Sequence, residues 1–166
     1  MSDLRSLLNA AMSQIDGDEA RADVEILAMH ALDKSRAWLF AHADYVATDI
    51  QAEWFARLVA ARASGEPIAY LTGRRGFRKL DLAVTPDVLI PRPETELLVE
   101  LALDRIPVDA EFRIADLGTG SGAIGLAIAR ERPHANILAT DASEVALVVA
   151  RENADRIGID NVDFER

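Results

Sequence analysis

The sequence predicts an α + α/β chain, in which a small helical bundle precedes a parallel sheet with flanking helices. Residues 1–66 carry apolar side chains at helical spacing. Residues 67–90 then bring glycines, prolines and a loose apolar alternation, which indicate a β-hairpin or extended linker. From residue 91 onward, short apolar runs alternate with helical segments, a pattern typical of βαβ units. We therefore expect three parts, 1–66, 67–90 and 91–166.

The composition limits the classes of protein to which the chain can belong. With 166 residues, half of them hydrophobic, it can hold one domain, or one small domain and part of another. The absence of cysteine excludes a disulfide framework and thiolate metal sites and suits a cytoplasmic location. The first residues lack a signal-peptide pattern and no apolar run is long enough to span a membrane, so we expect no membrane association. A net charge of −10 argues against a general nucleic-acid binder.

Four helices are expected in residues 1–66. The first starts at Ser2 or Asp3, the second carries Val24 to Leu32, the third is capped by Ser35, and the fourth opens with the capping box Thr48-Asp-Ile-Gln51 and stops at Ser64-Gly65 and Pro67. Their apolar stripes are interpreted as bundle core. His30 and His42 lie on predicted helices without partners at metal-ligand spacing, so both are interpreted as structural and no metal site is expected.

The predicted linker contains a basic cluster that stands out in an acidic chain. Its members are Arg74, Arg75, Arg78 and Lys79. One interpretation is a solvated hairpin, and the other is a contact surface for an acidic or RNA-bound partner. The sequence leaves both open.

After the linker, Leu89-Ile-Pro-Arg-Pro-Glu-Thr-Glu96 leads into a further helix. The two prolines hold the segment extended, and Glu94, Thr95 and Glu96 open an amphipathic helix. Acidic residues suit the positive end of a helix, so physical reasoning alone interprets this segment as an ordinary helix entry.

A glycine-rich turn organises the predicted sheet. An apolar run ends at Ile114 and Ala115, Asp116 follows at the carboxyl end of the strand, and Gly118, Gly120 and Gly122 come at alternate positions. Glycine allows positive φ and close approach of a ligand. The helix from about residue 123 to 132 then presents free N–H groups and its positive dipole end. The turn therefore predicts a nucleotide-like site at the carboxyl edge of the sheet.

The next segments extend the same sheet. A second strand is expected from Ala135 to Thr140, a helix from Ser143 to Ile157 closed by Gly158, and the start of a third strand at residues 161–164. Asp141 follows the second strand, where its carboxylate can accept hydrogen bonds from ribose hydroxyls.

Two ligands compete for the turn. Gly120, Gly122 and Gly125 fit G-x-G-x-x-G with Asp141 about 20 residues on, the fingerprint of a dinucleotide site. Asp116 disfavours that choice because it repels an anionic pyrophosphate. S-adenosylmethionine has no phosphate and carries an ammonium and a sulfonium, so a carboxylate beside it is favourable. The residues favour S-adenosylmethionine over a nicotinamide dinucleotide.

Three segments resemble the HemK-like release factor glutamine methyltransferases, in order and spacing. They are Gly65-Glu-Pro-Ile-Ala-Tyr-Leu-Thr-Gly73, Ile90-Pro-Arg-Pro-Glu-Thr-Glu96 and Asp116-Leu-Gly-Thr-Gly-Ser-Gly122. The resemblance implies a helical substrate-recognition domain, a hairpin linker and the first half of a Rossmann-like methyltransferase domain. It also implies methyl transfer from S-adenosylmethionine to the side-chain amide of the glutamine in the Gly-Gly-Gln motif of peptide chain release factors. No direct nucleic-acid binding is implied.

The same resemblance assigns roles to residues. The turn would wrap the methionine and ribose part of the cofactor, Asp141 would bind the ribose hydroxyls, and the segment before the helix would line the edge of the active site. The residues concerned are Asp116, Gly118, Thr119, Gly120, Ser121, Gly122 and Asp141 for the cofactor, and Arg92, Glu94 and Thr95 for the edge.

The sequence departs from the family in one respect. The family's catalytic Asn-Pro-Pro-Tyr motif, which holds the glutamine amide, does not occur in these 166 residues. We therefore expect no catalytic residue in this chain and interpret it as the N-terminal part of such an enzyme, inactive by itself. Other functions that remain open are a nicotinamide-dependent oxidoreductase, a non-enzymatic adaptor that binds release factors, and a nucleic-acid adenine methyltransferase.

Overall fold

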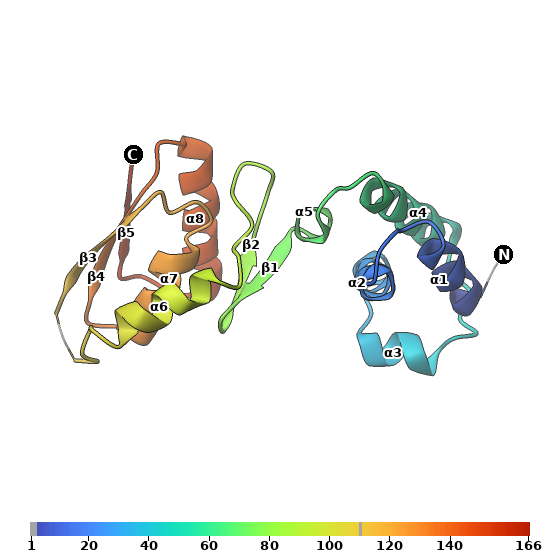
Figure 1. Ribbon diagram of the computed structural model, residues 1–166, viewed down its shortest axis with the longest axis horizontal. Helices are drawn as coiled ribbons and strands as arrows, with labels where there is room; N and C mark the ends of the chain where they lie inside the picture. The colour runs from blue at the N-terminus through green and yellow to red at the C-terminus, as the bar shows by residue number, and fades with distance from the viewer. Residues whose placement is uncertain (1–2, 110) are drawn as a thin grey trace. The chain divides into compact units, whose positions relative to one another are not determined.

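The structure, a computed structural model, describes residues 3–109 and 111–166, and it divides the chain into two compact units. The N-terminal unit is Met1–Thr72 and the C-terminal unit is Gly73–Arg166 (Figure 1). Each unit has its own cluster of buried apolar side chains. The units are therefore described one at a time.

The N-terminal unit is helical. Its helices are α1 (Leu4–Met12), α2 (Ala20–Leu32), α3 (Arg36–Ala41), α4 (Asp49–Ala63) and α5 (Ile68–Thr72). Three of them begin where the sequence places a cap. The side chain of Asp3 accepts from the Ser6 amide, that of Ser35 accepts from the Trp38 amide, and Thr48 forms the expected capping box with Gln51.

Two carboxylates are buried among the apolar side chains of this unit, and both lie on α2. Asp23 accepts from Arg62 Nε of α4 at 2.7 Å. Glu25 accepts from Arg21 Nε at 3.0 Å and from Arg36 Nε, in α3, at 2.8 Å. Burial by itself raises the pKa of Glu25, but the hydrogen bonds from the two arginines outweigh it and hold the pKa below its usual value. These pairs fasten α2 to α3 and α4.

The two histidines of the bundle make ring contacts. His42 stacks on Trp38 with ring centroids 4.4 Å apart, and the centroid of His30 lies 6.4 Å from that of Trp54. Within the described ranges no group of three or more metal-ligating side chains comes together. None of the helices there combines the length and apolar character needed to cross a lipid bilayer.

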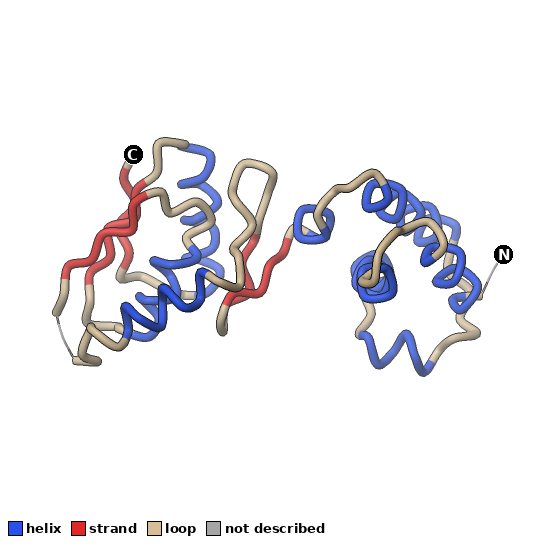
Figure 2. Tube along the Cα trace, in the orientation of Figure 1, coloured by secondary structure: helices blue, strands red, loops and turns tan. Residues whose placement is uncertain are grey.

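The C-terminal unit contains a hairpin and a parallel sheet (Figure 2). Its elements are β1 (Arg74–Phe77), β2 (Leu80–Ala83), α6 (Thr95–Leu103), β3 (Arg113–Leu117), α7 (Ala123–Glu131), β4 (Asn136–Thr140), α8 (Glu144–Ile157) and β5 (Val162–Glu165). β1 and β2 pair antiparallel, and the sheet has the order β3-β4-β5 with both pairs parallel. The succession β3-α7-β4-α8-β5 is the βαβαβ half of a Rossmann-like fold, which confirms the predicted fold class.

The helices of this unit bury one shared apolar cluster. α7 packs on the three strands of the sheet, α6 packs on α7, and α8 packs on β5 and on β2 of the hairpin. Leu126 of α7, Ile137 of β4 and Phe77 of β1 are each at most 1% exposed in this cluster. The hairpin therefore shares a core with the sheet.

The segment 67–90, expected to be a linker, is divided between the units. Its first residues form α5, which packs on α2 and α4, and the remainder begins the C-terminal unit with the hairpin. The sequence does not predict α5, because Pro67 by itself indicates only the end of the preceding helix. Proline also suits the start of a helix, and the Pro67 carbonyl accepts from the amides of Tyr70 and Leu71.

The basic cluster of the hairpin binds groups of its own unit. Arg74 pairs with Asp81, and Arg75 donates to the Pro91 carbonyl. The Arg78 amide donates to Glu96, the Arg78 side chain pairs with Glu100, and Lys79 pairs with Glu131. The hydrogen bond from Lys79 is the main cause that lowers the pKa of Glu131. These pairs favour the solvated-hairpin interpretation over a contact surface for an acidic or RNA-bound partner.

Candidate functional site

The glycine-rich turn lies between β3 and α7, at the carboxyl end of the sheet. The amides of Gly118 and Thr119 both donate to the Thr140 carbonyl at the end of β4, at 2.8 and 2.9 Å. The Gly122 amide donates back to the Thr119 carbonyl at 2.9 Å. The turn is therefore fixed to the neighbouring strand as well as to its own helix.

Asp116 is the penultimate residue of β3 and is only 9% exposed. Its Oδ2 accepts from Thr119 Oγ1 at 2.7 Å and from the amide of Gly125, in the first turn of α7, at 2.9 Å. A carboxylate thus occupies one of the free donors at the positive end of that helix. This places a negative charge where a dinucleotide site would hold phosphate.

The glycines of the turn fall into two kinds. Gly118, Gly120 and Gly122 have φ of +77°, +55° and +85°, which glycine adopts without strain. A Cβ on Gly118 or Gly120 would meet no atom within 4 Å, whereas one on Gly122 would lie 2.8 Å from Leu126 Cδ1. Gly125 is also packed, since its Cβ would lie 3.0 Å from Asp116 Oδ2. Open space therefore lies beside Gly118 and Gly120, while Gly122 and Gly125 serve packing.

Asp141 directly follows β4, and its carboxylate bonds to the glycine turn that follows β3. Its Oδ2 accepts from the Gly120 amide at 2.9 Å, and its Oδ1 accepts from the Ser143 amide at 2.9 Å. The residue is half-buried. Ionised carboxylate oxygens have about four lone-pair sites between them, so Asp141 keeps acceptor capacity beyond these two bonds.

Thr119 and Ser121 are buried, at 7% and 3% exposure. The Thr119 hydroxyl is committed to Asp116, and the Ser121 carbonyl accepts from Nδ2 of Asn153 in α8 at 2.9 Å. Both residues therefore shape the turn from within.

The residues expected at the edge of the active site lie on a different segment. Arg92 and Glu94 are exposed and Thr95 is half-buried. The Thr95 amide donates to the Arg92 carbonyl at 3.0 Å, in the turn that opens α6. The described hydrogen bonds gather Asp116, the glycine turn and Asp141 into one site. No hydrogen bond described there joins Arg92, Glu94 or Thr95 to that site.

Asn153 is a member of the site that the sequence did not lead us to expect. It is fully buried, and its side chain bonds to the glycine turn and to the hairpin. The available signal was its place on the apolar face of α8, at helical spacing from Ala146 and Ala150. A polar side chain on such a face needs partners.

Two family models match the chain. Residues 3–73 match the PrmC N-terminal domain, and residues 109–166 match a methyltransferase domain. The first match corresponds closely to the helical N-terminal unit. The second begins just before β3 and covers the glycine turn and Asp141.

Curated relatives match nearly the whole chain. A release factor glutamine methyltransferase of Xylella fastidiosa (strain 9a5c) is 54% identical over 159 residues, which are 96% of this chain and 56% of the relative. The protein of that name from Escherichia coli (strain K12) is 46% identical over 156 residues, 93% of this chain and 56% of its own. Among solved structures, the ribosomal protein L11 methylase of Lactobacillus delbrueckii subsp. bulgaricus is 33% identical, covers 45% of this chain and 38% of its own, and has a TM-score of 0.39.

The chain spans about half the length of the curated relatives that it matches. Within that span both expected parts are present in order, the PrmC N-terminal domain and then the methyltransferase domain. Over the part that it spans, the chain is 47 to 54% identical to release factor glutamine methyltransferases and is similar to them in sequence throughout.

Proposed function

We propose that the chain binds S-adenosylmethionine at the glycine turn of Gly118–Gly122. We further propose that it serves methyl transfer to the glutamine side chain in the Gly-Gly-Gln motif of peptide chain release factors, and so modulates translation termination in the cytoplasm. The observation that carries the cofactor proposal is the buried carboxylate of Asp116 beside the two open glycines.

The charge at the turn separates the two candidate cofactors. Asp116 takes up the Gly125 amide, which a pyrophosphate at the start of α7 would need, and adds a negative charge there. A cofactor with a sulfonium and an ammonium gains from that charge instead. The geometry therefore supports S-adenosylmethionine over a nicotinamide dinucleotide.

The residues of the site fit the remaining parts of such a cofactor. The space beside Gly118 and Gly120 admits a ligand against the backbone. The free lone pairs of Asp141 suit two vicinal ribose hydroxyls, because hydroxyls donate and this carboxylate accepts. Arg92, Glu94 and Thr95 remain proposed for the edge of the active site.

Methyl transfer to a glutamine amide depends on positioning of the two reactants more than on acid or base groups. When bound, the cofactor supplies an electrophilic methyl group on its sulfonium. A glutamine amide nitrogen is a weak nucleophile because its lone pair is delocalised into the carbonyl. Transfer therefore needs close approach and polar acceptors on the amide N–H groups. The residues of this chain bind and orient the cofactor, and the family's Asn-Pro-Pro-Tyr motif, which is not among them, holds the amide.

We assign recognition of the release factor to the helical N-terminal unit. Between α1, α2 and α3 this unit has a cavity of about 420 Å³ with an apolar floor that includes Leu8 and Val24. Exposed Phe40, Arg5 and the Arg21–Glu25 ion pair also line it. An apolar side chain would fit such a surface.

Titration calorimetry tests the cofactor. S-adenosylhomocysteine and NADH are each titrated into the chain under the same conditions. We expect a saturable heat with S-adenosylhomocysteine and none with NADH. Binding of NADH alone would replace the proposal with an oxidoreductase, and binding of neither would favour a non-enzymatic adaptor.

The substrate is tested with purified release factor. Phe40→Ala removes an exposed ring from the cavity wall and should weaken binding of release factor about tenfold, the scale of an interface hot spot. Ile50→Ala is the matched control, since Ile50 is 81% exposed on α4 and does not line the cavity. Equal losses in the two variants would place the contact elsewhere.

Methyl transfer is tested in a chimera. These 166 residues replace the matching part of the Escherichia coli relative, which supplies the rest of the fold. We expect labelled methyl to appear on the glutamine of the Gly-Gly-Gln motif. A chimera that binds the cofactor and leaves release factor unlabelled would contradict the proposed substrate.

A further inference from the structure

Asn153 connects three segments that are far apart in the sequence. It lies in α8 and is 0% exposed. Its Oδ1 accepts from the Ala83 amide at 2.7 Å, and its Nδ2 donates to the Ala83 carbonyl at 3.0 Å and to the Ser121 carbonyl at 2.9 Å. One buried side chain therefore holds both the last residue of β2 and the middle of the glycine turn.

The side-chain amide is fully used in this position. Besides the bond from Ala83, Oδ1 accepts from Arg156 Nη2 at 2.8 Å, so two donors and two acceptors meet the amide. An amide offers two N–H groups and one oxygen with two lone pairs. Aspartate cannot donate to the two carbonyls at neutral pH, and leucine would leave three buried backbone groups without this partner.

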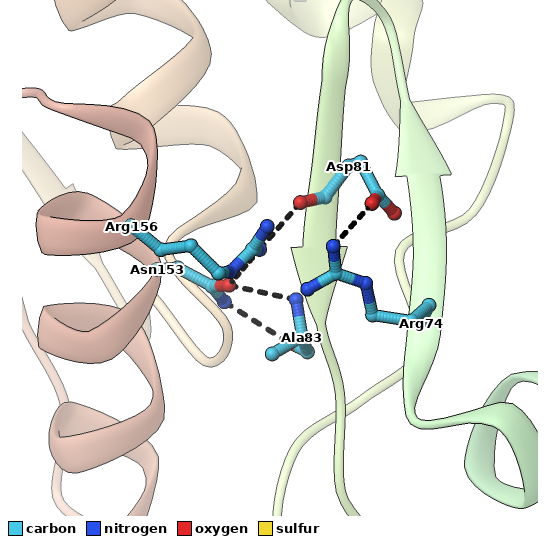
Figure 3. A network of polar contacts seen from close by, with 5 residues as sticks. All are labelled: Arg74, Asp81, Ala83, Asn153 and Arg156. Atoms are coloured by element: carbon cyan, nitrogen blue, oxygen red, sulfur yellow. Dashed lines mark hydrogen bonds and ion pairs between the residues drawn. The ribbon is translucent and has the colours of Figure 1, made fainter.

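Arg156 extends the connection along the hairpin. Its Nη2 donates to the Asp81 carbonyl as well as to Asn153 (Figure 3). The carboxylate of Asp81 in turn pairs with Arg74 on β1. Figure 3 shows Asn153 and Arg156 reaching from α8 to β2, with Arg74 on the neighbouring strand. The hairpin is thus fastened to the same helix that fixes the turn.

The hydrogen bond from Asn153 to Ser121 affects the shape of the glycine turn. Ser121 stands between Gly120 and Gly122, so a shift of its carbonyl moves the backbone of both. The strand side of the turn is fixed by the Thr140 carbonyl and Asp141, and the helix side is fixed by Asn153. Loss of the bond to Ser121 leaves that half of the cradle held only by bonds within the turn and α7, such as those from the Gly122 amide to Thr119 and from the Gly125 amide to Asp116.

We propose that Asn153 is a positioning residue for the cofactor, which holds the glycine turn in its binding shape and makes the hairpin part of the support of the site. This inference rests on the proposed binding of S-adenosylmethionine. It assigns a function to the hairpin beyond joining two units.

Asn153→Asp is the test variant, and Asn161→Asp is its control. The Asn161 side chain also donates to backbone carbonyls, those of Ala129, Arg132 and Ala135, but at the amino ends of the strands. We expect the Kd for S-adenosylhomocysteine to rise about tenfold or more in Asn153→Asp and to stay within about twofold in Asn161→Asp. Both variants should lower the thermal midpoint, but only Asn153→Asp should raise the Kd. A rise in Kd in that variant alone therefore reports positioning of the turn and not a general loss of stability.

Amide hydrogen exchange gives a second readout, without ligand. Exchange at Thr119, Gly120 and Gly122 should quicken in Asn153→Asp and remain unchanged in Asn161→Asp. Equal exchange at these amides in both variants would overturn the inference. Absence of S-adenosylhomocysteine binding by the unaltered chain would instead overturn the proposed function, while exchange still decides the role of Asn153.

A measurement on the unaltered chain covers the case in which Asn153→Asp does not fold. If the connection holds, binding of S-adenosylhomocysteine at the turn should slow exchange of the Ala83 amide in the hairpin, because the two segments share one side chain. Slower exchange at the turn with no change at Ala83 would overturn the inference.

Discussion

At the scale of single residues, some glycines of the turn are packed against neighbouring side chains and others face open space where a ligand could bind. Gly120 has φ +55° and open space where a Cβ would stand. Gly120→Ala should therefore place a methyl group in the space proposed for the cofactor and weaken binding of S-adenosylhomocysteine at least about tenfold. Backbone strain should also lower stability by about 1 kcal/mol. Calorimetric titration and thermal unfolding measure the two effects.

Gly158→Ala is the control for Gly120→Ala. Gly158 caps α8 with φ +75°, and a Cβ there would also meet no atom within 4 Å, but the residue lies away from the turn. The variant should lose similar stability and keep its affinity. If both variants bind S-adenosylhomocysteine like the unaltered chain, the cradle is not at Gly120.

The Asp141 carboxylate accepts from the Gly120 amide and is the proposed acceptor of the ribose hydroxyls. Asp141→Ala removes the acceptor of the Gly120 amide and the proposed acceptor of the ribose hydroxyls. We expect the Kd for S-adenosylhomocysteine to rise about 10- to 100-fold, the range for hydrogen bonds to a charged group. Asp160→Ala removes an exposed carboxylate before β5 and should leave the Kd unchanged. Affinities that fall equally in both variants would point to net charge as the cause.

Spacing along the sequence predicts the residues of the turn but not their partners. Asp116, Gly118 and Gly120 could be found because one strand, one turn and one helix follow one another within a few residues. The role of Asn153 could not, since it depends on Ala83, 70 residues away in the chain. Such a contact exists only once the hairpin packs on α8.

At the scale of elements, buried ion pairs join the helices of the N-terminal unit. The pKa of Glu25 lies below its usual value of 4.5, so its charged form stabilises the fold. That contribution is complete above the unfolded pKa and is lost as the pH falls through the lower folded value. Glu25→Gln should therefore cost about 1 kcal/mol of unfolding free energy at pH 7, and the cost should shrink as the pH falls below the usual pKa and vanish below the lowered folded pKa.

Urea unfolding followed by tryptophan fluorescence measures this effect. Both tryptophans lie in the N-terminal unit, so the signal reports that unit. Glu53→Gln changes an exposed carboxylate on α4 and should be near neutral at each pH. A cost for Glu25→Gln that persists in acid would mean that packing, not charge, is lost.

At this scale the sequence predicts the starts of capped helices well, because a cap depends only on residues close together in the chain. Thr48 and Gln51 stand three residues apart and suffice to start α4. The ion pairs of Asp23 and Glu25 are different, since Arg62 and Arg36 come from other helices. The charge pattern of α2 by itself did not predict that these carboxylates are buried.

At the scale of the whole molecule, the described residues form two hydrophobic cores that share no buried residue. The proposed cofactor site lies entirely within the C-terminal unit, and both tryptophans lie in the other. We therefore expect two thermal transitions that respond differently to ligand. A ligand stabilises only the unit whose native state it binds.

S-adenosylhomocysteine at about 100 times its Kd should stabilise the C-terminal unit by about 2.7 kcal/mol. For a unit of this size, that corresponds to a rise of roughly 10 to 20 °C in its midpoint by calorimetry. The transition seen by tryptophan fluorescence should not move, because it belongs to the N-terminal unit. Gly120→Ala, whose Kd is expected to be at least about tenfold higher, is the control, and the same ligand concentration should raise its calorimetric midpoint by about half as much or less. A fluorescence midpoint that rises together with the calorimetric one would mean that the two units unfold as one, and that recognition of substrate and cofactor are energetically coupled in this chain.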